Sequence, residues 1–244
     1  MTLFITSSPF DTDTDHPRFW EKNGFAQRLR EALPPFPRVT FVAADPERHD
    51  LTCQFGADVF CALTDAGIYP ECYRVLDDTN LGEAPELVSC SDLLIFSGGH
   101  VPTQADFFEE MGLRELLCAY DGTILGISAG SMNMARTVYA HPEEPGEAAD
   151  PDYPRFFPGL DLTEVQILPH YPQWANKTLD GLRLMEDIAL PDSQDNCFFV
   201  LYDGSYFYQD PETLLLCGRS LLARDGQLTE LAEDGEVLDM AQFQ

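Results

Sequence analysis

Short apolar runs alternate with amphipathic stretches through the first two thirds of the chain. Each run holds branched or aromatic side chains between turn residues, which is typical of strands buried on both faces. The predicted strands are Leu3–Thr6, Val39–Ala43, Cys72–Leu76, Leu93–Phe96 and Thr123–Ile127. Between them, apolar side chains recur at helical spacing over Phe19–Leu33, Leu51–Ala66 and Ala105–Tyr120. This alternation predicts an α/β fold with a parallel sheet that helices cover on both faces.

The pattern changes after the fifth strand. Ser131–Ala140 has a helical pattern, whereas His141–Gly159 is rich in Pro, Glu and Asp and predicts a long surface loop. We expect a further strand at Val165–Leu168 and a helix at Lys177–Ile188. From Cys197 to Leu231, turn pairs separate short apolar runs and predict consecutive β-hairpins. No stretch has the composition of a linker, so a single domain over residues 1–244 is expected.

Charge is the strongest compositional signal. The 244 residues include 42 Asp and Glu against 14 Lys and Arg, which gives a formal net charge of −28. A chain this acidic repels polyanions, so nucleic acid and anionic membranes are excluded as its main partners. Seven cysteines without a C-x-x-C pair indicate reduced thiols rather than a disulfide framework or a metal site. Because there is no basic leader and no apolar run of about 18 residues, we expect a cytoplasmic protein.

The most informative stretch is Gly126-Ile-Ser128-Ala-Gly130, which begins in the fifth predicted strand. A Gly-x-Ser-x-Gly turn between a strand and a helix holds the serine hydroxyl exposed at the carboxyl end of the strand, as a nucleophile requires. The backbone N–H groups that follow can stabilise an oxyanion. Gly-Ser-Gly turns are common, so a purely structural turn is the alternative. The context on both sides favours Ser128 as a nucleophile.

A second source of oxyanion donors is predicted one strand earlier, where Leu93–Phe96 leads into Ser97-Gly98-Gly99-His100. Tandem glycines at the same edge of a parallel sheet allow backbone N–H groups to point into the crevice. The alternative is an ordinary tight connection between strand and helix. His100 either lines the site or begins the next loop.

The candidate base is His170, which ends an apolar strand and therefore points, like Ser128, to the carboxyl edge of the sheet. The candidate acid is Asp203, which directly follows the run Cys197–Tyr202, although Asp203-Gly204 is also a frequent hairpin turn. The chain order is serine, histidine, acid. The α/β-hydrolases have the order serine, acid, histidine, so the sequence does not fit that fold.

These stretches resemble the peptidase S51 family, which includes peptidase E and cyanophycinase and has a fold like that of class I glutamine amidotransferases. The resemblance runs through most of the chain and is carried by Gly126–Ser131, Phe96–Gly99, Leu168–Pro172 and Tyr202–Gly204. It implies one three-layer α/β/α domain with a mostly parallel flavodoxin-like sheet and C-terminal β-hairpins.

The resemblance also implies the roles of single residues. Ser128 would be the nucleophile, His170 the base and Asp203 the acid of a serine peptidase. The oxyanion hole would be formed by the amides of Gly98, Gly99 and Ala129. No metal ion or organic cofactor is implied.

The sequence departs from the family in two places. Members often have a third glycine followed by Asn-Thr-Phe-Gln, whereas this chain has His100-Val-Pro-Thr-Gln104 and shares only the glutamine. The segment after His170 is also poorer in basic residues than in peptidase E, whose substrates carry an N-terminal aspartate and need a cation. The candidate substrate-binding residues are His100, Gln104, Lys177 and Arg183, although Arg183 could equally pair with a helical neighbour.

The expected function is that of a serine peptidase or amidohydrolase that cleaves small peptides, Asp-X dipeptides among them. The alternatives are a cyanophycinase-like or isoaspartyl-peptide hydrolase, and a non-catalytic relative whose altered glycine loop binds a ligand. The charge of −28 works against an anionic substrate. A small peptide is the expected partner. A homodimer is compatible with an exposed hairpin edge, but no residue pattern demands one.

Overall fold

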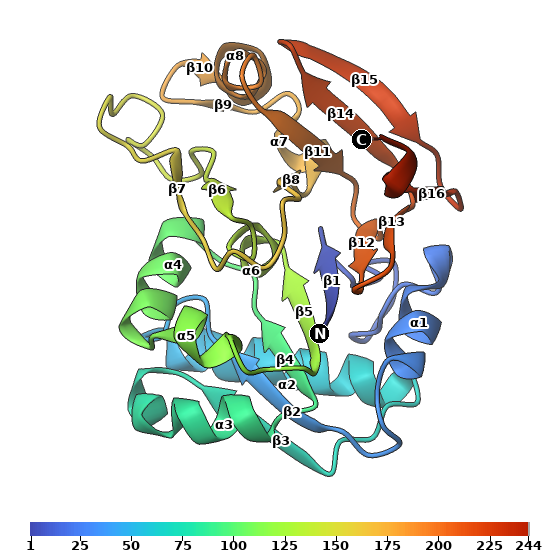
Figure 1. The fold of residues 1–244 in the computed structure, drawn as a ribbon. Coiled ribbons are helices and arrows are strands. Elements are labelled where there is room, and N and C mark those ends of the chain that lie inside the picture. The colour runs from blue at the N-terminus through green and yellow to red at the C-terminus, as the bar shows by residue number, and fades with distance from the viewer. Residues whose placement is uncertain (244) are drawn as a thin grey trace.

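A large mixed sheet forms the centre of the molecule (Figure 1). Its parallel strands are β1 (Thr2–Thr6), β2 (Arg38–Val42), β3 (Cys72–Leu76), β4 (Leu93–Phe96) and β5 (Thr123–Ile127). Three antiparallel strands extend it: β12 (Tyr206–Gln209), β13 (Leu214–Cys217) and β16 (Val237–Asp239). The order is β16-β13-β12-β1-β5-β4-β2-β3. In this computed structural model, which describes residues 1–243, the five predicted parallel strands are therefore confirmed.

Helices cover both faces of this sheet. One face packs against α1 (Phe25–Glu31) and α2 (His49–Asp65), and the other against α3 (Ala84–Cys90), α4 (Val101–Glu110), α5 (Leu113–Leu117) and α6 (Ala129–Met132). Alternate strand residues divide between the two layers, since Phe4 faces α1 whereas Leu3 and Ile5 face the other side. The predicted three-layer α/β/α architecture is confirmed. No helix within residues 1–243 combines the length and the apolar character that a membrane crossing needs.

A second, smaller sheet lies beside the carboxyl edge of the first (Figure 1). It has the order β15-β14-β11-β8 and consists of β8 (Ile167–Leu168), β11 (Cys197–Leu201), β14 (Ser220–Arg224) and β15 (Gln227–Ala232). β8 and β11 are parallel neighbours, with Leu168 opposite Val200. The chain therefore leaves these two strands at adjacent points, and these exits carry His170 and Asp203.

Two predicted helices are wrong. In Ser131–Ala140, α6 stops at Met132, and the β-branched run that follows becomes β6 (Thr137–Tyr139), paired with β7 (Phe156–Pro158). In Lys177–Ile188, β9 (Thr178–Leu179) and β10 (Leu182–Arg183) form a hairpin before a π-helical stretch at Leu184–Ala189. Both turn residues of that hairpin, Asp180 and Gly181, have positive φ. An Asp-Gly turn signal therefore outweighed the helical spacing.

Other elements differ less from expectation. The predicted helix Ala105–Tyr120 divides into α4 and α5 at Gly112, which has a φ of 63°. The helix α3 and the short helices α7 (Tyr171–Trp174) and α8 (Leu190–Asp192) were not predicted. The C-terminal hairpins are confirmed for β12–β13 and β14–β15, but β11 joins the small sheet instead of pairing with β12.

Candidate active site

Ser128 occupies a sharp turn between β5 and α6. Its backbone has a φ of 51° and a ψ of −110°, a region that non-glycine residues rarely adopt. The Ser128 N–H donates to the carbonyl oxygens of Thr6 at 3.1 Å and Ser7 at 3.0 Å, which ties the turn to the end of β1. At Gly130, a Cβ atom would lie only 2.2 Å from the carbonyl oxygen of Phe96. Glycine is therefore required there for the turn to pack against β4.

The glycine turn after β4 lies next to Ser128. A Cβ atom on Gly98 would be 3.5 Å from the Cβ atom of Ser128, and one on Gly99 would be 2.6 Å from the Cβ atom of Ala44. In the described part of the chain, neither the N–H of Gly98 nor that of Gly99 donates a hydrogen bond. These two N–H groups are thus free to donate to a ligand that lies beside Ser128 at the carboxyl edge of the large sheet.

His170 and Asp203 meet where the small sheet adjoins the large one. His170 Nδ1 and Asp203 Oδ1 are 2.7 Å apart, and about a quarter of each side chain is exposed, 27% and 26% respectively. Burial raises the pKa of Asp203, but hydrogen bonds from His170, Ser7 and Gln173 outweigh it and hold this pKa below its ordinary value. The carboxylate is therefore ionised at neutral pH and can orient the imidazole.

Ser7 joins these groups, and no sequence motif predicted this role for it. Its hydroxyl donates to Asp203 Oδ1 at 2.7 Å and accepts the backbone N–H of His170 at 2.8 Å. Its carbonyl oxygen accepts the N–H of Ser128. One residue at the carboxyl end of β1 thus contacts all three members of the predicted triad. The available signal was a pair of serines directly after the first predicted strand.

The segment from His141 to Glu147 closes one side of this region. Glu147 Oε1 pairs with His100 Nε2 at 2.8 Å, and its other oxygen accepts the N–H groups of Glu143 and Glu144 at 2.8 and 2.9 Å. His100 Nδ1 lies 2.8 Å from the hydroxyl of Thr103. Both ring nitrogens of His100 are therefore engaged, and this residue anchors the loop to the glycine turn.

Two titratable groups of this loop have shifted pKa values. Burial lowers the pKa of His141 to about 4, assisted by the charges of Lys177 and His170. Burial raises the pKa of Glu143 to about 7, although His100, His170 and Lys177 oppose the shift. His141 is therefore neutral at physiological pH, and Glu143 titrates near neutrality. The composition of this segment had predicted only a surface loop for both residues.

The remaining predicted substrate-binding residues lie in different settings. Gln104 is fully buried, and it donates to the carbonyl oxygen of Ser97 and accepts from Asn133, so it supports the glycine turn from inside. Arg183 forms a bidentate pair with Asp187 on the surface. Lys177 is exposed near the loop. Gln104 and Arg183 thus have protein partners for their polar groups.

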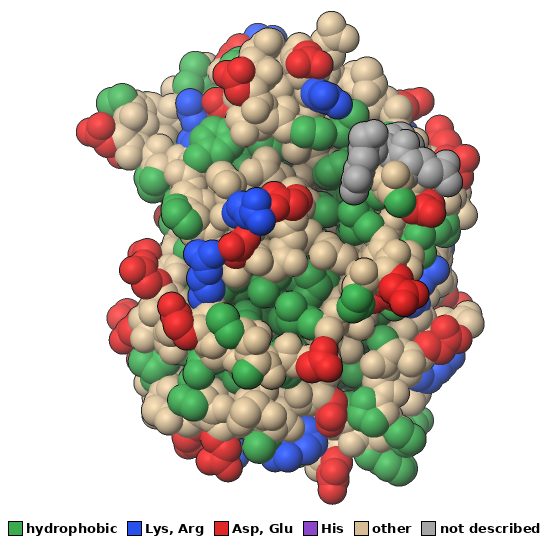
Figure 2. Space-filling view, in the orientation of Figure 1, with side chains coloured by type: hydrophobic (Ala, Val, Ile, Leu, Met, Phe, Trp, Pro, Cys, Tyr) green, Lys and Arg blue, Asp and Glu red, His purple; other side chains and the backbone are tan. Residues whose placement is uncertain are grey.

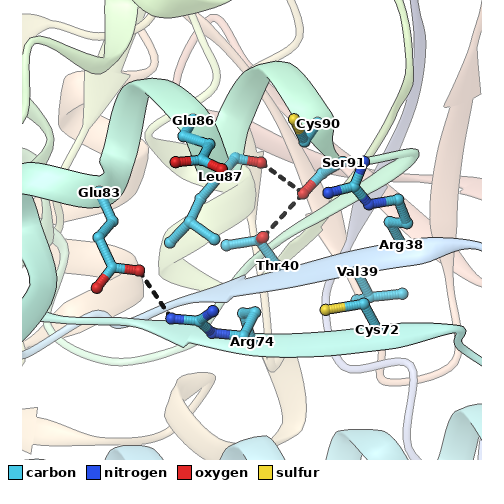
Figure 3. Close-up of a pocket in the computed structure, with 10 residues that line it drawn as sticks. All are labelled: Arg38, Val39, Thr40, Cys72, Arg74, Glu83, Glu86, Leu87, Cys90 and Ser91. Carbon is cyan, nitrogen blue, oxygen red and sulfur yellow. Dashed lines mark hydrogen bonds and ion pairs between the residues drawn. The ribbon is translucent and has the colours of Figure 1, made fainter.

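Two hollows lie away from this constellation. A small cavity of about 100 Å³ beside α3, β2 and β3 contains the pairs Arg74–Glu83 and Thr40–Ser91 (Figure 3). A larger one of about 640 Å³ lies between α4, α5 and residues 154–160. Figure 2 shows that acidic side chains are scattered over the face that it draws. Neither of these two is lined by Ser128, His170 or Asp203, whereas a third hollow of about 200 Å³ is lined by Asp203 together with Pro172, Tyr202 and Arg219.

One group of described residues has the spacing of metal ligands. His49, Asp77 and Asp78 have ligand atoms within 4.8 Å of one another. His49 already pairs with Asp78 at 2.6 Å, and Asp77 accepts the N–H of Thr79 at the start of a helical turn. An ion pair and a helix cap account for this group.

Comparison with known proteins establishes the fold. No family model matches the sequence, and no curated protein matches it. Several solved structures have a similar fold, two of which are named as peptidases. One is a peptidase from an acI-B1 Actinobacterium, with a TM-score of 0.67 and 16% identity over 98% of this chain and 96% of that one. The other is a candidate Peptidase E protein from Listeria monocytogenes EGD-e, with a TM-score of 0.56 and 15% identity over 95% of this chain and 98% of that one. The α/β/α architecture is thus shared along nearly the whole of all three chains.

Proposed function

We propose that this chain is a serine-type peptidase of the peptidase E kind that acts on small peptides. The observation that carries the proposal is the contact of Ser7 with Ser128, His170 and Asp203, because it connects a strained serine turn with an acid–imidazole pair. The similarity of the fold to two structures named as peptidases supports the same reaction class.

The proposed reaction is acyl transfer. His170 Nε2 accepts the proton of Ser128 Oγ while the oxygen attacks the amide carbonyl carbon. The N–H groups of Gly98, Gly99 and Ala129 stabilise the oxyanion. His170 then gives the proton to the leaving amine as the C–N bond breaks. Water, deprotonated by His170, hydrolyses the acyl-enzyme and returns the serine. Asp203 stays ionised and stabilises the imidazolium.

A fluorophosphonate probe tests this proposal directly. Mass spectrometry should find one adduct on Ser128 in the purified protein and none in the Ser128→Ala variant. Ser89→Ala removes an exposed serine on α3 and should leave labelling unchanged. A panel of Asp-X, isoAsp-X and neutral dipeptides then defines the substrate. Absence of the adduct at Ser128 would favour the non-catalytic alternative, in which the crevice only binds a ligand.

A further inference from the structure

The loop from His141 to Glu147 is held at two places, one beside the glycine turn and one beside α7. At one end, Glu147 pairs with His100, directly after the glycine turn. At the other end, the His141 ring packs against Trp174 with centroids 5.3 Å apart, and Trp174 belongs to α7, which begins directly after His170. Glu143 lies between these two anchor points. The charges of both His100 and His170 act on Glu143, so its carboxylate lies near the glycine turn and near the proposed base.

The carboxylate of Glu143 has no hydrogen-bond donor among the described residues. The ring of His141 comes nearest, with Nε2 3.9 Å from Oε1, and His141 is neutral at physiological pH. Lys177 influences Glu143 electrostatically, but no ion pair within 4.0 Å joins the two in the described chain. The Glu143 side chain is 33% exposed, so a small molecule can reach it. Keeping a partly buried carboxylate ionised without a positive partner costs free energy. A cationic ligand would remove that cost.

His141 gives a second, independent indication of a ligand. It is only 6% exposed, yet its Nδ1 atom has no partner in the part of the chain that the structure describes. Buried polar atoms are nearly always hydrogen-bonded in folded proteins. Next to Glu143 there is thus a buried imidazole with unused hydrogen-bonding capacity.

We propose that Glu143 forms a subsite for a cationic group of the substrate, an ammonium or a guanidinium, beside the carbonyl group that Ser128 attacks. The position of this subsite relative to the reaction rests on the proposed function. Ionised Glu143 supplies a charge-assisted hydrogen bond to the cation. The net charge of −28 also attracts a cationic substrate toward the crevice, whereas it repels an acidic one.

Two parts of a peptide can supply this cation: the α-ammonium group at the N-terminus, or a basic side chain. Three probes separate them. Ala-Ala amide carries only the α-ammonium charge, N-acetyl-Lys-Ala amide carries only the side-chain charge, and N-acetyl-Ala-Ala amide is neutral. Calorimetric titration at pH 8 into the Ser128→Ala variant measures binding without turnover.

We expect one of the two charged probes to bind at least about tenfold more tightly than the neutral probe, and to identify the source of the cation. Adding Glu143→Gln to the Ser128→Ala variant should remove this preference. The matched control, Glu144→Gln, changes the exposed neighbouring carboxylate and should preserve it. Equal binding of charged and neutral probes, or a preference that persists in Glu143→Gln, would overturn the proposal.

The labelling experiment tests the peptidase proposal and the binding experiment tests the subsite, and either can fail without the other. If Ser128 forms no adduct but cation binding depends on Glu143, the proposed peptidase activity is wrong and the subsite stands as a ligand site. If Ser128 is labelled and binding does not depend on Glu143, the peptidase proposal stands and the subsite is wrong.

Discussion

Ser7 Oγ and His170 Nδ1 both lie 2.7 Å from the same oxygen atom, Oδ1 of Asp203. The hydroxyl of Ser7 also accepts the backbone N–H of His170. The hydroxyl of Ser7, which follows β1 of the large sheet, therefore fixes Asp203 and His170 relative to each other. Ser7 is a positioning residue in the proposed mechanism, since it acts on Asp203 and His170 rather than on the substrate.

Replacing Ser7 with Ala should lower kcat roughly tenfold and change KM little, because the orientation of His170 is lost while the substrate crevice is retained. The pKa of Asp203 should rise at the same time, because Asp203 loses a hydrogen-bond donor, and NMR titration of its carboxyl carbon should detect that rise. Ser8→Ala removes the adjacent hydroxyl and should leave both parameters unchanged. A purely structural Ser7 would lower the melting temperature without changing kcat or the pKa of Asp203.

Asp203→Asn should be far more damaging to activity than to stability. The amide cannot stabilise the imidazolium and favours the wrong tautomer of His170, so kcat should fall on the order of 10⁴-fold. Circular dichroism should remain that of the folded protein. A larger loss, on the order of 10⁶-fold, is expected for His170→Ala in a dipeptide assay, because the proton acceptor itself is removed. A kcat within threefold of the parent protein would remove Asp203 from the mechanism.

Gly130→Ala should disrupt folding through a backbone clash, because the new Cβ atom would lie 2.2 Å from the Phe96 carbonyl oxygen. We expect a loss of about 3 kcal/mol or more in the free energy of unfolding, measured with urea. Gly82→Ala is the matched control, since nothing lies within 4 Å of its Cβ position and its φ is not positive. A Gly130→Ala protein as stable as Gly82→Ala would contradict the close approach of β4 and α6.

Glu143→Gln should stabilise the free protein at alkaline pH. The pKa of Glu143 is raised to about 7 in the folded protein, so ionising it favours the unfolded chain, and stability is lost as pH rises from the ordinary pKa of 4.5 toward 7. The variant lacks this loss, so its free energy of unfolding at pH 8 should exceed that of the parent protein by roughly 1–2 kcal/mol. This figure is smaller than the full pKa shift would give, because the side chain is partly solvated. At pH 4 the gain should vanish. Urea titrations of Glu143→Gln and Glu144→Gln at both pH values measure it, and a gain that does not change with pH contradicts the shift.

The sequence predicted the central elements because their signals are local. Five buried strands, the turn at Ser128 and the glycines after Phe96 are each defined by a few consecutive residues. The structure brings His170 and Asp203 into hydrogen-bond contact, as placing both at strand ends suggested, while their roles stay a prediction. Ser7 was missed because its bond to Asp203 joins residues 196 positions apart. Glu143 was missed because only tertiary packing distinguishes its carboxylate from the other acidic side chains.

The residues of the candidate triad come from both sheets. Ser128 and Ser7 follow strands of the large sheet, whereas His170 follows β8 of the small sheet and Asp203 lies on the connection from β11 to β12. In the proposed mechanism, a small displacement between the sheets would leave every strand and helix intact and still separate Ser128 from His170. We therefore expect inactivation and unfolding to be separable, so that heating abolishes turnover at a lower temperature than it abolishes the circular dichroism signal.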